Sequence, residues 1–170
     1  MNMLDRYEIR AAKPGDLEQI FMLWGALMDD HAEYDCFWER APGADDMFRS
    51  WMSKQINIAT SCVVVAASED RLLGYVGGLE NFHPPIYRVS RHLLLTDMYV
   101  LPADRCKGVG AALVDYVKDW AAAHGYERVE LSAAPQNEAG LRFWARVGFI
   151  EYQRYLAFKT PSTSAYITGR

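Results

Sequence analysis

The sequence predicts a single mixed α/β domain. With 170 residues, of which 51% are apolar and 13% aromatic, the chain can form one packed core. Strand-like runs alternate with segments of helical period. At one junction an apolar run, Leu93 to Val100, leads into a glycine-rich turn and then a long amphipathic segment. We expect one domain over residues 1–160 and a loosely held tail over residues 161–170.

The first part of the chain predicts one strand and two helices. Tyr7 to Ala11 has the character of a strand. Pro14-Gly15-Asp16 follows as a turn and N-cap, and the helix that it opens should end near His31. A connection rich in aromatic and acidic residues and broken by Pro42-Gly43 then precedes a second helix over Ala44 to Ile56. Because the connection has no regular period, we expect ligand binding to shape it.

The middle of the chain predicts a hairpin. Cys62 to Ala67 is a β-branched run, and after a polar turn Leu72 to Leu79 forms the second strand. Gly74, Gly77 and Gly78 weaken that strand, which indicates a bulge or a close approach of another backbone. The loop that contains Pro84 and Pro85 then returns the chain to the apolar run.

The last part of the chain predicts two more helices and further strands. Gly108 to His124 has one apolar face, and Gly125 is placed to end this helix. A strand over Arg128 to Ala133 and a helix over Asn137 to Val147 follow. Closing strands are expected within Phe149 to Lys159.

Composition excludes several functional classes. The net charge is −4 with a pI near 5.5, so the sequence lacks the basic footprint of a nucleic-acid-binding protein. No apolar run approaches the roughly 18 residues of a membrane span, and the N-terminus lacks the apolar core of a signal peptide. Cys36, Cys62 and Cys106 are odd in number and scattered, which argues against disulfides or a zinc cluster and favours a reducing cytoplasm. The four histidines lack metal-ligand spacing, so we expect no metal.

The glycine-rich turn, Arg105 to Ala111, predicts an anion site. Glycines let a backbone approach a ligand closely, and the N–H groups at a helix start attract negative charge. A dinucleotide fingerprint would need a third glycine where Leu113 stands, and the Gly-Lys-Ser/Thr of a P-loop is absent. The expected ligand is a phosphate or pyrophosphate.

This turn resembles the acyl-CoA loop of the GCN5-related N-acetyltransferases (GNAT family). The pattern of that loop is Arg or Gln, any two residues, Gly, any one residue, and then Gly or Ala. The preceding Leu95 to Val100 is similar to the family's central strand. A second family segment, Asn-x-x-Ala-x-x-Phe-Tyr-x-x-x-Gly-Phe, is matched by Asn137, Gly140, Phe143, Trp144, Gly148 and Phe149. Two positions depart from it, Gly140 for alanine and Trp144 for tyrosine.

The resemblance implies a mixed, largely antiparallel sheet with a splayed central strand pair, helices on both faces, and acetyl-CoA as cofactor. The family's strand pairs through its backbone with the pantetheine arm of the cofactor. Asn137 either contacts this arm or caps its helix. Trp144 is explained as a core aromatic residue that packs under the pantetheine arm. The implied cofactor-binding residues are Met98, Tyr99, Val100, Arg105, Cys106, Lys107, Gly108, Val109, Gly110, Ala111, Asn137 and Trp144.

Transfer of an acetyl group to an amine needs a base, because a free alkylammonium has a pKa near 10.4. Asp97 stands in the strand where the family often places its acid, and Glu80, at the end of the preceding strand, is the second candidate. A structural role as a backbone or arginine partner is the alternative for each. The family's proton donor is tyrosine, whereas the indole of Trp144 cannot release its proton. Three explanations account for the missing donor: the sulfur leaves as a thiolate, a phenol such as that of Tyr152 or Tyr99 gives the proton, or catalysis has been lost.

The resemblance implies an acetyl-CoA-dependent N-acetyltransferase, whose acceptor we expect to be a primary amine of a small cationic metabolite or antibiotic. Acidic residues support this class by attracting cations, although a solvated surface also explains them; they are Asp29, Asp30, Glu33, Asp35, Glu39, Asp45 and Asp46. The alternatives are a protein or peptide N-acetyltransferase and a non-catalytic acyl-CoA sensor. A homodimer would follow the family's habit. We expect no nucleic-acid or membrane partner.

Overall fold

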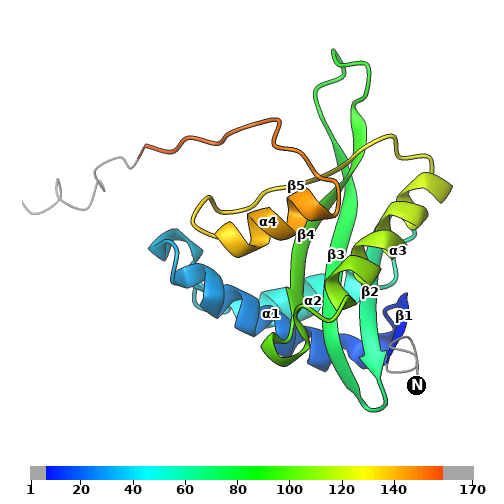
Figure 1. Ribbon diagram of the computed structural model, residues 1–170, viewed down its shortest axis with the longest axis vertical. Helices are drawn as coiled ribbons and strands as arrows, with labels where there is room; N and C mark the ends of the chain where they lie inside the picture. Colours follow the sequence, from blue (N-terminus) through cyan, green and yellow to red (C-terminus); the bar gives the residue numbers. More distant parts are fainter. Residues whose placement is uncertain (1–6, 159–170) are drawn as a thin grey trace, which may run out of the picture.

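The computed structural model describes residues 7–158 as a five-stranded sheet with helices on both faces (Figure 1). The tail predicted over residues 161–170 lies outside the described residues. The strands are β1 (Glu8–Ala11), β2 (Ser61–Ser68), β3 (Arg71–Phe82), β4 (Arg91–Val100) and β5 (Val129–Leu131). The helices are α1 (Leu17–Ala32), α2 (Ala44–Gln55), α3 (Val109–Ala123) and α4 (Glu138–Arg146), with short 3-10 turns at Pro14–Asp16, Cys36–Trp38 and Pro102–Asp104. The predicted helices and the first five strands are therefore present.

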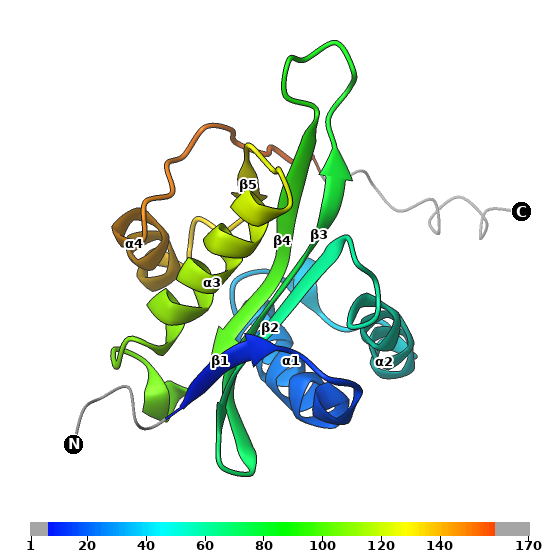
Figure 2. The same cartoon turned by 90° about the vertical axis from the view of Figure 1, so that its right-hand side faces the viewer.

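The domain has three layers, with α3 and α4 on one face of the sheet and α1 and α2 on the other (Figure 2). Alternating side chains of the strands divide the core into two clusters. Val64, Leu93 and Leu113 belong to the cluster under α3, and Val65, Tyr75 and Met52 to the cluster under α1 and α2. None of the helices within residues 7–158 is long and apolar enough to cross a membrane.

The strands follow one another across the sheet in chain order. Each neighbouring pair is antiparallel except β4 and β5, which are parallel because α3 carries the chain back over the sheet. The sheet is therefore mixed and largely antiparallel, as the resemblance implied.

An irregularity interrupts β4 at Thr96. On β3 the neighbours Gly77 and Gly78 face Asp97 and Leu95, so Thr96 is an extra residue in the ladder. Side chains change faces at this point, because Leu95 packs under α3 whereas Tyr99 packs under α1 and α2. The bulge that the β3 glycines indicated is therefore present.

The glycines of β3 allow β4 to approach closely. A Cβ atom on Gly74 would lie 2.6 Å from the carbonyl oxygen of Tyr99, and one on Gly78 would lie 2.9 Å from Leu95 Cδ2. A side chain at Gly74 would push the two strands apart, whereas one at Gly78 would displace the Leu95 side chain.

The closing strands expected within Phe149 to Lys159 are wrong for residues 149–158, which form no strand. The segment after α4, orange in Figure 1, runs away from the domain. Ile150 and Leu156 are 84% and 96% exposed. A strand needs a hydrogen-bonded partner, and within residues 7–158 β5 pairs with β4 alone, so residues 149–158 join no sheet.

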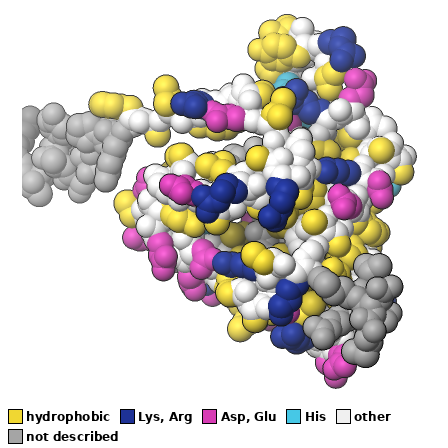
Figure 3. Space-filling model, in the orientation of Figure 1, with side chains coloured by type: hydrophobic (Ala, Val, Ile, Leu, Met, Phe, Trp, Pro, Cys, Tyr) yellow, Lys and Arg dark blue, Asp and Glu magenta, His cyan; other side chains and the backbone are white. Residues whose placement is uncertain are grey.

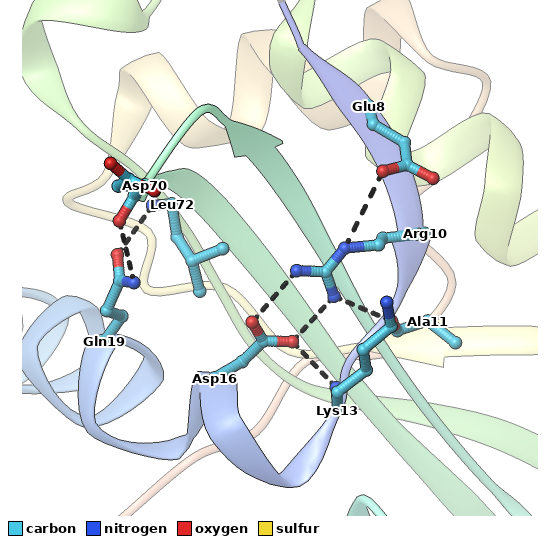
Figure 4. Close-up of polar contacts among 8 residues, drawn as sticks. All are labelled: Glu8, Arg10, Ala11, Lys13, Asp16, Gln19, Asp70 and Leu72. Atoms are coloured by element: carbon cyan, nitrogen blue, oxygen red, sulfur yellow. Dashed lines mark hydrogen bonds and ion pairs between the residues drawn. The ribbon is translucent and has the colours of Figure 1, made fainter.

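A buried ion pair joins β1 to the start of α1 (Figure 4). The guanidinium of Arg10 donates to both carboxylate oxygens of Asp16 at 2.7 and 3.0 Å, and the Lys13 N–H donates to the same carboxylate at 2.7 Å. Asp16 stands at the N-cap position as predicted, but its side chain turns back to these donors instead of capping α1. The Arg10 hydrogen bond, opposed by burial, lowers the pKa of Asp16.

We predict that Asp16→Asn lowers the free energy of unfolding by about 2–4 kcal/mol at pH 7, since Arg10 would lose its counter-charge in a largely buried setting. The lowered pKa means that this contribution is present above the ordinary aspartate pKa of about 3.9 and is lost as the pH falls further. Urea unfolding of variant and parent should therefore converge in acid. Glu8→Gln is the control, because Glu8 is exposed and its carboxylate is as far as 3.9 Å from Arg10 Nε. This variant should change the free energy of unfolding by less than about 0.5 kcal/mol. Equal losses in both variants would contradict this account.

Candidate functional site

The central feature of the site is the place where β4 and β5 part. The two strands pair only from Leu93 to Leu95 on β4 and from Val129 to Leu131 on β5. Beyond the Thr96 bulge, β4 continues to Val100 beside β3, and β5 no longer accompanies it. Among residues 7–158, the backbone edge of Thr96 to Val100 therefore has no strand neighbour on that side, and an extended ligand could pair with it. The splayed strand pair that the resemblance implied is present.

A socket for an anion lies where β4 leads to α3. Cys106 and Gly108 have φ angles of +59° and +87°, which turn the backbone sharply before the helix. The first hydrogen bond of α3 runs from Ala112 N–H to the Gly108 carbonyl. Among the described residues, the N–H groups of Val109, Gly110 and Ala111 have no acceptor. Three donors and the positive end of the helix dipole can therefore bind a phosphate.

Basic side chains surround this socket. The Arg105 guanidinium donates to the Val100 carbonyl at 2.9 Å and to Asp30 at 3.3 Å, and it lies over the Tyr99 ring at 5.1 Å. Lys107 lies 3.5 Å from Asp104 and is half exposed. Arg105 therefore links the end of β4 to α1, whereas Lys107 can turn toward an anion.

Figure 3 shows how charge is distributed on this face. Lys and Arg side chains are spread over the middle of the face, where α4 and the start of α3 lie. Acidic side chains gather at its left edge, where α1 ends. The two neighbouring regions are suited to an anionic and a cationic ligand, respectively.

Helix α4 begins with the cap that the sequence suggested. The side chain of Asn137 accepts from the Gly140 N–H at 2.8 Å, so its amide oxygen is engaged in capping. A Cβ atom on Gly140 would lie 2.5–2.9 Å from the Asn137 side chain. Glycine in place of the family's alanine therefore makes room for the folded-back cap.

Aromatic residues of α4 pack against the start of α3. A Cβ atom on Gly110 would lie 3.1 Å from the Phe143 ring and 3.3 Å from Met98 Cε. The ring of Trp144 contacts those of Phe143 and Phe149 edge to face, with centroids 5.0 and 5.2 Å apart. Gly110 is thus needed for packing as well as for ligand approach. Trp144 belongs to an aromatic cluster beside the opening between the strands.

Asp97 lies immediately after the bulge, on the face of the sheet covered by α1 and α2. Its carboxylate Oδ2 is 3.8 Å from where a Cβ of Gly77 would stand, and Met52 Cε on α2 is 3.9 Å from the same point. Burial raises the pKa of Asp97, and the neighbouring Thr96 hydroxyl, which itself donates to the Gly77 carbonyl at 3.3 Å, opposes this only in part. A carboxylate with a raised pKa is a stronger base than an exposed one.

Glu80, the second candidate base, is engaged elsewhere. Its carboxylate accepts from Arg91 Nε and, at 3.1 Å, from the Tyr126 hydroxyl. The bond from Arg91 is the main reason that the pKa of Glu80 is lowered. In the β-ladder Glu80 faces Leu93, on the far side of the bulge from Asp97. This environment fits the structural alternative and makes Glu80 a poor base.

The structure also assembles a polar cluster that the sequence did not reveal, around Glu130 of β5. His83 Nε2 lies 2.9 Å from one carboxylate oxygen, and Tyr152 and Arg128 both donate to the carboxylate. His92 is buried, stacks on His83 at 4.2 Å and lies 3.8 Å from the second oxygen. The three possible metal ligands, His83, His92 and Glu130, come from three separate segments, so their spacing gave no metal signal.

This cluster fits a hydrogen-bonded network better than a metal centre. The ligand atoms of His83, His92 and Glu130 lie within 4.8 Å of one another. However, the Arg128 guanidinium donates to the same carboxylate, and its fixed positive charge opposes a cation there. Burial alone would raise the pKa of Glu130, but the bonds from His83, Tyr152 and Arg128 outweigh it and lower the pKa to about 2.

Most of the acidic segment has partners within the domain. Arg40 pairs with Asp29 at 2.9 Å and with Asp45 at 3.3 Å. Asp46 lies 3.9 Å from Arg49, and Asp35 accepts from the Phe37 N–H. These contacts hold the connection between α1 and α2 and reduce the negative charge available to a ligand.

A model of the acetyltransferase (GNAT) family matches residues 24–149. The uncharacterized protein ML0378 of Mycobacterium leprae is 32% identical over 89 residues, which cover 52% of this chain and 23% of that protein. The chain thus matches about a quarter of the length of this curated relative.

Solved structures share the fold at low identity. An aminoglycoside antibiotic 6'-N-acetyltransferase from Acinetobacter haemolyticus has a TM-score of 0.72 and 19% identity, over 91% of this chain and 98% of that one. A predicted acetyltransferase from Clostridium acetobutylicum, solved with acetyl-CoA, has a TM-score of 0.74 and 15% identity, over 90% of this chain and 96% of that one. At these identities the likeness concerns the fold.

We predict that Glu130→Gln lowers the free energy of unfolding at pH 7 by roughly 3 kcal/mol, the equivalent of a pKa held at about 2 instead of 4.5. The pKa of Glu130 is lower in the folded than in the unfolded chain. Its contribution to the free energy of unfolding is therefore complete above about pH 4.5 and disappears as the pH falls toward 2. Urea unfolding at pH 7 and pH 3 measures both parts. Glu127→Gln is the matched control, since Glu127 is exposed and pairs with exposed Arg88. A deficit that stays constant with pH would contradict the ionised network.

Proposed function

The chain belongs to the acetyltransferase (GNAT) family, and from this membership we propose that it transfers an acetyl group from acetyl-CoA to a primary amine. The observation that carries the proposal is the geometry of β4. Within residues 7–158 this strand has an open edge beyond the bulge, an anion socket at its end and a half-buried carboxylate, Asp97, in the strand itself. An extended anionic cofactor could therefore bind along β4, next to a carboxylate that can act as a base.

The residues present fit the cofactor. The N–H groups of Val109, Gly110 and Ala111, assisted by Lys107 and Arg105, would hold the pyrophosphate. The backbone of Met98 to Val100 would pair with the pantetheine arm, which Phe143 and Trp144 would flank. Cys106 contributes its left-handed backbone to the turn. Asn137 would act through the position of α4 that it caps.

Asp97 would serve as the base. Bound acetyl-CoA supplies an activated thioester: the amine nitrogen forms a bond to the acetyl carbon while the carbon–sulfur bond breaks. An ammonium ion must first lose one proton, which passes to the Asp97 carboxylate. The second proton leaves the nitrogen as the amide forms, and the sulfur takes up one proton to become the thiol. The raised pKa of Asp97 brings it nearer to the working pH.

The sulfur needs no dedicated acid in this proposal. A thiol has a pKa near 8.5, so a thiolate can leave and collect a proton from water. Trp144 packs among aromatic rings, and an indole does not release a proton. The hydroxyl of Tyr152 already donates to Glu130. Burial and this hydrogen bond both raise the pKa of Tyr152. Tyr152 is therefore a weaker candidate for a donor than the sequence alone suggested.

The acceptor class we propose is a small cationic amine. Acidic side chains at the end of α1 support it, and the aminoglycoside acetyltransferase of similar fold acts on such a compound. Paired carboxylates such as Asp29 and Asp30 weaken the attraction, so a protein or peptide amine is the second candidate. The non-catalytic sensor is the third. A homodimer is a further proposal that rests on family habit.

A reducing cytoplasm is the location we propose. The structure has free thiols at Cys36, Cys62 and Cys106, of which Cys62 is buried. Burial raises the pKa of the Cys62 thiol to about 12, so it stays protonated and unreactive. Free thiols are usual where glutathione keeps cysteine reduced.

Release of free thiol from acetyl-CoA tests the function itself. The panel should contain polyamines, aminoglycosides, amino acids and peptides. Amine-dependent release with the small cations and not with the peptides is the expected result. Release only with peptides would favour the second candidate, and cofactor binding without release for any amine would favour the sensor.

We predict that Asp97→Asn lowers turnover at neutral pH by roughly 10²–10⁴-fold, the usual contribution of a general base. The deficit should narrow at alkaline pH, where the amine is neutral without help, and the affinity for acetyl-CoA should be nearly unchanged. Steady-state rates from pH 6 to 10 measure this. Asp115→Asn, an exposed carboxylate of α3, is the control. The same deficit at every pH would make Asp97 a structural residue.

We predict that Lys107→Glu raises the dissociation constant for acetyl-CoA at least about tenfold, or roughly 1.4 kcal/mol, because it places a negative charge beside the phosphate socket. Replacing Gly110 would be less informative, since a new side chain would also meet Phe143. Calorimetric titration measures the change. Lys54→Glu, on α2 across the sheet, should bind the cofactor as the parent does. Unchanged affinity in Lys107→Glu would remove the socket assignment.

A further inference from the structure

A buried hydroxyl on the strand next to that of the proposed base has no hydrogen-bond partner among the described residues. Tyr75 of β3 is 0% exposed, and its hydroxyl finds no acceptor among the described residues. A buried, unpaired hydroxyl destabilises the folded state, which favours a phenylalanine at such a position unless the hydroxyl is used. We therefore asked which polar group it can reach.

The sheet register places Tyr75 beside Asp97. Tyr75 faces Tyr99 across β3 and β4, and Gly77, two residues along, faces Asp97. Tyr75 and Asp97 are diagonal neighbours in the ladder, and Tyr75 and Tyr99 both pack in the cluster under α1 and α2. Because Gly77 has no side chain, it does not separate them.

Within residues 7–158, Thr96 is the one side chain that lowers the pKa of Asp97. Helix α2 contributes the apolar Met52 nearby, and the charges of α1 at Asp29 and Asp30 act on Tyr99 instead. The remaining group coupled to Asp97 is Tyr75, whose pKa is raised by burial and by the Asp97 charge. Its phenol therefore stays protonated and keeps its O–H as a donor.

From this register, burial and unused donor we propose that Tyr75 is a positioning residue for Asp97, whose hydroxyl donates to the Asp97 carboxylate through one bridging water. Such a water satisfies the buried phenol and links two polar groups that make no direct bond. The arrangement would hold the carboxylate in one orientation and limit how far burial raises its pKa. This inference deepens the proposed function, since it concerns the same base, but it can be tested without any acetyl transfer.

The direct test is the titration of the Asp97 carboxyl carbon by NMR in the full chain. The parent, Tyr75→Phe and Asp97→Asn are compared, and the last identifies the signal. Loss of a donor to a charged group should raise the pKa of Asp97 by about one pH unit or more in Tyr75→Phe. The acid limb of the pH–rate profile should move to higher pH by the same amount, while KM for acetyl-CoA stays constant.

Two further measurements separate this role from simple packing. Tyr116→Phe is the matched control, because Tyr116 packs on the opposite face of the sheet, and it should leave the Asp97 titration unchanged. Thermal unfolding of Tyr75→Phe checks that the variant folds. An unchanged Asp97 titration together with higher stability would show an unused hydroxyl and overturn the proposal. If Asp97 titrates as expected but no amine is acetylated, the positioning role stands and the proposed function fails.

Discussion

The site depends on one extra residue in a strand. At Thr96 the ladder between β3 and β4 shifts by one position, and pairing between β4 and β5 stops one residue earlier. The shift reverses which side chains face each helix layer, so that Asp97 points to the layer of α1 and α2. A regular strand would have placed this carboxylate under α3. Bulges next to functional sites commonly redirect a side chain in this way.

Three carboxylates near this sheet differ in chemistry because their neighbours differ. Arg91 and Tyr126 donate to Glu80, and His83, Tyr152 and Arg128 surround Glu130, so the pKa of each carboxylate is lowered. Asp97 lies in an apolar setting with only a weak donor, and burial raises its pKa. A base must both accept and release a proton near the working pH, and this contrast among the three carboxylates is the reason that we propose Asp97 as the base.

Local patterns predicted the helices, most strands and the glycine-rich socket, because capping, periodicity and positive φ angles are properties of short segments. The sequence could not assign the residues that distant segments bring together. Glu130 and its histidines were missed because β5, β4 and a loop meet only in the fold. The sequence also showed no sign of the role proposed for Tyr75, since a tyrosine in an apolar strand is expected to be a core residue. The closing strands failed because a strand pattern does not provide a partner strand.

Hydrogen exchange with and without acetyl-CoA tests the central claim, that the cofactor lies along the open edge of β4 with its pyrophosphate on the start of α3. The account predicts slower exchange at Thr96 to Val100 and at the N–H groups of Val109 to Ala111, with little change in β1 and β2. Binding of acetyl-CoA that protects other segments, and leaves the N–H groups of Val109 to Ala111 unchanged, would contradict it.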